Sequence, residues 1–234
     1  MAKARLSIIL EDVRGKAGPV VFAESRQGLV VKPRITPANP DTAAQQSARS
    51  YFGRSASAFK NMSVSQANAW ENYAQTIHKE TVTGKKYNPT GISAFIALSS
   101  KFLQVTPAGT IPLTPPSTGF TGDNISITAT AGTGVINVTS SGANTANCTT
   151  EILLQPLASP HVNPQKGKFR HKEFVSFPSG SSPVPINVGA GWYAVAYRFV
   201  NKLTGQVTQP VQIPLVQVSL SVTEGGTQRA NKAA

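Results

Sequence analysis

The spacing of hydrophobic and polar positions changes about half-way along the chain. Residues 42–59, 63–77 and 91–105 repeat apolar side chains at steps of three and four, the period of a helix with one buried face. From residue 125 onward, short runs alternate apolar and polar side chains, as half-buried strands do. The pattern therefore predicts a helical first half followed by a β-rich second half.

The second and third predicted helices carry the clearest local signals. Ser63 and Gln66 have the spacing of a capping box, which predicts the start of the second helix. Trp70 and Tyr73 are the largest side chains on its apolar face, and we interpret them as core between helices. The third helix, residues 91–105, is apolar on most sides, so we expect it to be buried by its own domain or by another subunit.

Residues 1–37 predict an extended β-arm. Three short β-prone runs lie within it, with a glycine-containing hairpin turn at residues 24–28. An arm of this kind buries little of itself, so we expect it to pair with a neighbouring subunit through the main chain of residues 6–10 and 20–22. The alternative is an arm that folds back on its own helices. The expected contact residues are Leu6, Ile8, Leu10, Val20, Phe22 and Val30.

The β-rich half follows a proline-rich stretch, residues 106–116, which predicts a semi-rigid linker. Six or seven short strands within residues 117–222 predict an antiparallel β-sandwich of immunoglobulin or fibronectin type III class. The Cys…Trp…Cys pattern of true immunoglobulins is missing, which favours the fibronectin type. The expected class is therefore α+β: arm and three helices in 1–105, linker, sandwich, and a flexible tail at 223–234.

Charge adds a candidate interaction surface. The chain has 22 Lys and Arg against 10 Asp and Glu, a net charge of +12, which favours polyanions or acidic protein surfaces. Four basic residues alternate at Lys166, Lys168, Arg170 and Lys172. On a strand they would share one face and could contact nucleic acid or an acidic partner. The same alternation also fits an edge strand protected by charge against aggregation.

The sequence offers few residues for catalysis or metal binding. Cys148 is the single cysteine, so an internal disulfide and a cysteine zinc cluster are excluded, and we expect it to be a small buried hydrophobe. His78, His161 and His171 lack metal-ligand spacing. We therefore expect no catalytic residue, no cofactor, no metal and no enzymatic activity. No apolar run approaches the roughly 18 residues of a membrane helix, and no secretory signal is found, so we expect synthesis in the cytoplasm and no membrane partner.

The first 105 residues resemble a family of tailed-phage and prophage proteins. The resemblance is carried, in order and with similar spacing, by residues 14–18, 28–34, 37–42, 45–52, 62–70, 73–74 and 90–95. One departure is Met62-Ser63, where the family usually has Leu-Thr.

The resemblance implies a structural protein of the virion, made in the host cytoplasm. We expect a capsid decoration or cement subunit that contacts major capsid or tail subunits and forms a homo-oligomer in a symmetric assembly. Two alternatives stay open. One is a tail or head–tail connector component, and the other is a nucleic-acid-binding virion protein that neutralises packaged DNA.

Overall fold

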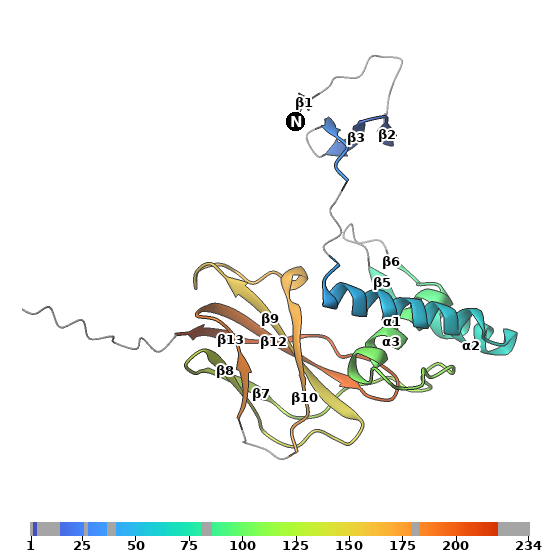
Figure 1. The fold of residues 1–234 in the computed structure, drawn as a ribbon. Helices are drawn as coiled ribbons and strands as arrows, with labels where there is room; N and C mark the ends of the chain where they lie inside the picture. Colours follow the sequence, from blue (N-terminus) through green and yellow to red (C-terminus); the bar gives the residue numbers. More distant parts are fainter. Residues whose placement is uncertain are drawn as a thin grey trace, which may run out of the picture. The chain divides into compact units, whose positions relative to one another are not determined.

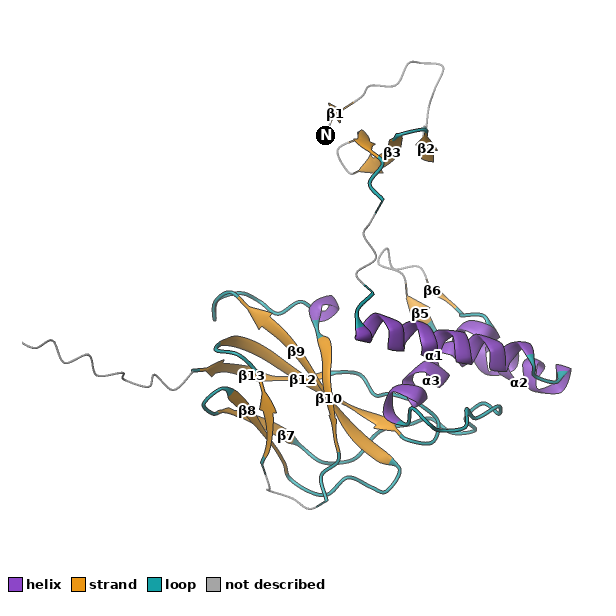
Figure 2. Ribbon diagram, in the orientation of Figure 1, coloured by secondary structure: helices purple, strands orange, loops and turns teal. Residues whose placement is uncertain are grey.

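The computed structural model describes residues 2–3, 15–25, 28–36, 41–80, 86–178 and 183–219. Within them the chain contains three α-helices and four antiparallel sheets, which confirms the α+β class (Figures 1 and 2). The helices are α1 (Ala43–Lys60), α2 (Val64–Gln75) and α3 (Gly91–Val105), with one short 3-10 helix, η1 (Lys166–Lys168). The strands are β1 (Ala2–Lys3), β2 (Gly15–Ala17), β3 (Val20–Ser25), β4 (Gly28–Pro33), β5 (Lys79–Glu80), β6 (Lys86–Tyr87), β7 (Ile127–Ala131), β8 (Val135–Ser140), β9 (Cys148–Leu157), β10 (Arg170–Val175), β11 (Val184–Asn187), β12 (Gly191–Asn201) and β13 (Val211–Val218).

The chain divides into two compact units, Met1–Gln46 and Ser47–Ala234. The proline-rich stretch 106–116 lies inside the second unit and contacts its helices. Trp70 Nε1 donates to the carbonyl oxygen of Leu113 (2.8 Å), and Arg54 Nη1 donates to that of Pro107 (2.6 Å). The separation of a helical and a β-rich domain at this stretch stays a prediction.

The first unit contains a four-stranded sheet in the order β1-β4-β3-β2. β3 and β4 form the expected hairpin, with Ser25 opposite Gly28. Gly18, with φ of 57°, allows the tight turn between β2 and β3. Both edges of β3 are thus paired within the unit, so the main chain of residues 20–22 is not available to a neighbour as expected. Leu6, Ile8 and Leu10 lie outside the described residues.

The helices pack around an aromatic core. The capping box at the start of α2 is confirmed, because Ser63 Oγ accepts from the Gln66 amide and Gln66 Oε1 accepts from the Ser63 amide. Trp70 is 2% exposed and meets Phe95 of α3 edge to face, with ring centroids 5.1 Å apart. Trp70 therefore serves as core between helices, as the sequence predicted.

Seven strands of the second unit form two antiparallel sheets, ordered β10-β9-β12-β13 and β11-β8-β7. Their apolar side chains meet in one hydrophobic core to which every one of these strands contributes. Central members include Ile136 of β8, Ile152 of β9 and Val195 of β12, all fully buried.

Strand β11 escaped the sequence analysis because prolines surround it. Pro185 lies within the strand, and proline has no amide hydrogen for the ladder. β11 is an edge strand that pairs only with β8, which is the place where a sheet tolerates proline. The rule that made residues 183–187 look like a loop thus explains their position at the edge.

The four-stranded sheet is covered on both faces over part of its area. Side chains of β9 are buried without a break from Cys148 to Gln155, although successive residues point to opposite faces. One set, including Ile152, enters the shared core. The other set, Glu151, Leu153 and Gln155, lies on what we call the outer face of the sheet. Contacts from α3 and from the segment before β10 cover this outer face.

Candidate binding site on the outer face of the sheet

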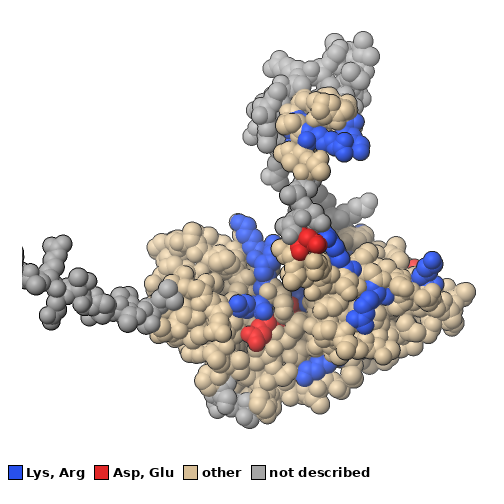
Figure 3. All heavy atoms as spheres, in the orientation of Figure 1, with Lys and Arg blue, Asp and Glu red and all other residues tan. Residues whose placement is uncertain are grey.

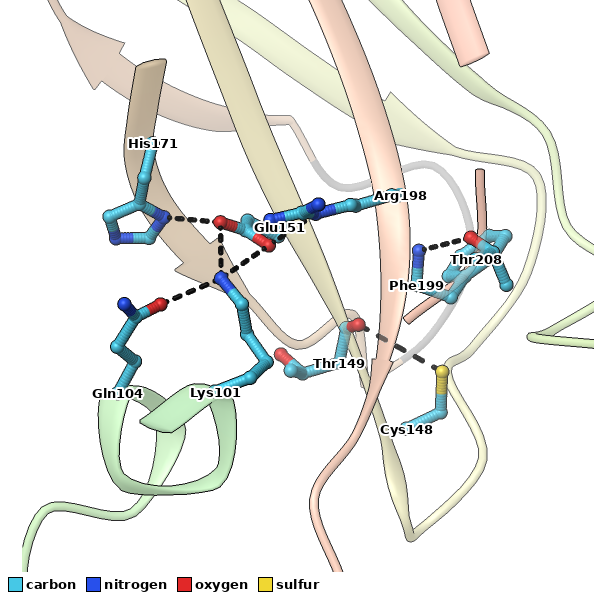
Figure 4. A network of polar contacts seen from close by, with 9 residues as sticks. All are labelled: Lys101, Gln104, Cys148, Thr149, Glu151, His171, Arg198, Phe199 and Thr208. Atoms are coloured by element: carbon cyan, nitrogen blue, oxygen red, sulfur yellow. Dashed lines mark hydrogen bonds and ion pairs between the residues drawn. The ribbon is translucent and has the colours of Figure 1, made fainter. Parts of the chain in front are cut away.

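A fully buried carboxylate lies at the centre of the outer face. Both oxygens of Glu151 accept from Lys101 Nζ, at 3.0 and 3.1 Å. Arg198 Nε lies 2.7 Å from Oε2, and His171 Nδ1 lies 3.0 Å from Oε1. Figure 4 shows these three side chains pointing at Glu151 from α3, β12 and β10. One carboxylate thus links a helix to two strands that flank β9.

The local sequence explains this arrangement. Glu151 is the one charged residue of β9, and Arg198 is the one charged residue of β12. The register of these strands places the two residues directly opposite each other. A charge buried in an apolar strand requires a partner of opposite sign, and cross-strand neighbours on one face are close enough to provide it.

The surroundings of Glu151 keep it ionised. Burial by itself would raise the pKa of this carboxyl group, but hydrogen bonds from His171 and Arg198 and the charges of Lys101 and Arg198 outweigh it. The pKa of Glu151 is lowered to about 2 as a result. Burial also lowers the pKa of Lys101, an effect partly offset by the nearby carboxylate. Glu151 is therefore a poor proton acceptor at neutral pH and acts as a fixed negative charge.

A pocket of about 750 Å³ opens beside this carboxylate. Its cationic lining consists of Lys101, Lys166, Arg170 and Arg198, together with His171. Four basic side chains against the single carboxylate of Glu151 leave a net charge of +3 with His171 neutral. The pocket thus has the electrostatic character of a site for an anionic group.

The structure brings together two of the four basic residues singled out in the sequence. Lys166 and Arg170 line the pocket, whereas Lys168 and Lys172 do not. The four do not share one strand face, because Lys166–Lys168 form a 3-10 turn and β10 begins only at Arg170. An irregularity in the register between His171 and Glu173 then displaces Lys172. Figure 3 shows Lys and Arg side chains gathered over η1 and the start of β10.

Sequence reasoning missed Lys101, Glu151 and Arg198. A signal for two of them was present, since Glu151 and Arg198 each interrupt a long apolar strand. A lone acid in one buried strand and a lone base in another indicate a buried ion pair. Nothing in the sequence of α3 distinguishes Lys101 from an ordinary solvated lysine.

The remaining candidates have structural environments. Cys148 is 1% exposed, which confirms it as a buried residue, and burial together with the neighbouring Asp123 raises its pKa to about 12. His78 Nδ1 lies 3.0 Å from Asn88 Oδ1, and His161 is exposed. Across the described residues, no three His, Cys, Asp or Glu side chains gather closely enough to hold a metal ion. None of the helices in that part of the chain is long and apolar enough to cross a membrane.

No known protein family, curated protein or solved structure matches this chain. The resemblance of the first 105 residues to tailed-phage proteins stays a prediction that rests on the sequence.

Proposed function

We propose that this chain is a non-enzymatic structural subunit of a tailed-phage particle, attached to the capsid as a decoration or cement protein. The observation that carries the proposal is the lack of a core in the first unit. Among the residues of this unit whose exposure is described, none is buried, and Val20, Phe22 and Val30 are only half-buried. A small sheet in this condition gains stability when a partner covers its apolar side chains.

Charge indicates what kind of partner would cover the sheet. Lys16, Lys32 and Arg34 are exposed on or beside its strands. Cations around an apolar patch favour an acidic partner surface, since complementary charge speeds association and fixes orientation. A capsid subunit with an acidic outer surface meets both requirements, and symmetry of the shell would repeat the contact many times.

We also infer that β7 to β13 form a sandwich of the fibronectin type III kind. The support is strand order: the first, second and fifth strands make one sheet, and the third, fourth, sixth and seventh make the other. A second support is Tyr193, near the start of β12, whose hydroxyl donates to the carbonyl oxygen of Gly189 four residues earlier (3.0 Å). This contact has the position and geometry of the tyrosine corner of such sandwiches. Modules of this kind occur in many functional settings, so the sandwich alone does not identify the function.

Removal of residues 1–40 tests the proposed role of the first unit. We expect the shortened chain to keep the melting temperature of the second unit and to lose binding to purified particles. The full chain, added back to particles stripped of it, provides the control. If the shortened chain still binds particles as well as the full chain does, the first unit is not the attachment element and the proposal fails.

Salt dependence separates this proposal from DNA neutralisation. A protein that contacts several phosphates loses DNA affinity with a log–log slope of about −0.9 per contact as salt rises. A decoration protein held by apolar contacts stays on its particle in high salt. DNA binding of that steepness, without binding to DNA-free particles, would contradict the proposal.

A further inference from the structure

We infer that the pocket on the outer face is a binding site for an extended acidic peptide, which pairs its main chain with the outer edge of β10 and places carboxylates against Lys166 and Arg170. The inference concerns the second unit alone. It does not depend on the proposed virion role, because it can be tested with the purified chain and a synthetic peptide.

The first argument is the charge that Glu151 leaves uncompensated. Glu151 occupies Lys101 and Arg198 through hydrogen bonds, but Lys166 and Arg170 have no acidic partner among the described residues. Arg170 uses only Nη1, toward the carbonyl oxygens of Gly167 and Phe169. Both side chains are exposed and belong to the pocket lining, so their remaining donors are available to an incoming carboxylate.

The second argument is the position of β10. This strand is at the edge of the four-stranded sheet and pairs only with β9 among the described strands. Its first four residues are exposed. An edge of this kind accepts an added strand about 4.8 Å away through main-chain hydrogen bonds. Side chains of an added strand alternate between faces, so acidic residues at every second position would all face the pocket.

The third argument distinguishes a peptide from a nucleic acid. Leu153, Phe169, Ala196 and Pro210 contribute apolar surface to the pocket beside its cations. The methylene groups of a Glu or Asp side chain can pack on such surface, whereas a phosphate backbone contacts chiefly the cations. The fixed negative charge of Glu151 also opposes a dense row of phosphates more than it opposes spaced carboxylates. A peptide therefore uses the edge, the apolar walls and the cations together.

The test measures binding of a short fluorescent peptide with glutamate at every second position and threonine between. We expect saturable binding that is weakened about 10-fold or more by the Lys166→Gln/Arg170→Gln double variant, since each lost charge-assisted hydrogen bond costs at least this factor. The matched control is Lys168→Gln/Lys172→Gln, which removes the same charge from the same segment without touching the pocket. We expect less than about a three-fold effect for it. Melting temperatures of both double variants establish that they are folded.

Two altered ligands complete the test. Replacement of every glutamate by glutamine removes the carboxylates, and N-methylation of alternate peptide nitrogens removes the main-chain donors. We expect each change to weaken binding about 10-fold or more. The inference is overturned if the acidic peptide does not bind, if both double variants weaken it equally, or if the N-methylated peptide binds as tightly. It is also overturned if a single-stranded oligonucleotide of equal charge binds as tightly as the peptide.

Discussion

Replacement of Glu151 by glutamine removes the one charge that links α3, β10 and β12. Glutamine keeps the volume of the side chain, so no cavity forms. Its carbonyl oxygen can still accept a hydrogen bond from one donor, but its amide nitrogen then faces a second donor, Lys101 or Arg198. Both cations lose their carboxylate, and their side chains are only 13% and 23% exposed. The variant therefore leaves two half-desolvated positive charges without a partner.

The expected destabilisation follows from two independent arguments. Removal of one member of a buried ion pair typically costs about 3–5 kcal/mol. The pKa of Glu151 is about 2 in the folded chain, against roughly 4.3 for an unperturbed glutamate. About two pKa units at roughly 1.4 kcal/mol each give about 3 kcal/mol of stability at neutral pH. We therefore expect Glu151→Gln to lower the free energy of unfolding by about 3 kcal/mol.

Denaturant unfolding at pH 7 and at lower pH measures this contribution. Because the folded pKa of Glu151 is lowered, its contribution is complete above the unfolded pKa and declines as pH falls toward about 2. The variant has no carboxyl group to protonate at this position. The difference in unfolding free energy between wild type and variant should thus be largest at pH 7 and shrink between about pH 5 and pH 2.

Glu173→Gln provides the matched control, since Glu173 is an exposed acid of β10 close to the same site. Its removal should change stability by less than about 0.5 kcal/mol. The reasoning is refuted if Glu151→Gln costs less than about 1 kcal/mol at pH 7. It is equally refuted if the difference between wild type and variant stays constant from pH 7 to pH 3.

Three further substitutions test other parts of the fold by thermal or denaturant unfolding. Tyr193→Phe removes the hydroxyl contact before β12 and should cost about 1 kcal/mol, whereas an unchanged stability would contradict the corner assignment. Gly205→Ala should cost more than about 2 kcal/mol, because φ is 74° and the added Cβ would overlap the carbonyl oxygen of Leu98. Its control, Gly53→Ala in the open middle of α1, should stabilise by about 0.5–1 kcal/mol. Ser63→Ala should cost about 1 kcal/mol through loss of the α2 cap, and a cost near zero would show that the cap is not needed.

Local patterns were sufficient for much of the fold. The capping box at Ser63 and the apolar spacing of α3 depend on neighbours within one or two turns, so the sequence carries them directly. The β3–β4 hairpin depends likewise on a local glycine turn. β11 was missed because tertiary position, at the edge of a sheet, decides whether a strand tolerates Pro185.

The candidate site was only partly predictable because it is assembled from distant segments. Glu151, His171 and Arg198 meet through strand register, and Lys101 reaches them from a helix 50 residues earlier. Alternation correctly marked the basic segment at 166–172. It gave the wrong geometry there, since the 3-10 turn and the irregularity after His171 break the strand period. No local pattern encodes either interruption.

Copy number in the particle tests the central claim most directly. Quantitative mass spectrometry of purified tailed-phage particles from the organism that encodes this chain would measure it against the major capsid protein. A capsid decoration subunit should be present at a fixed ratio and on the order of hundreds of copies per particle. About six or twelve copies would contradict the capsid position, and absence of the chain from intact particles would contradict a structural role in the virion altogether.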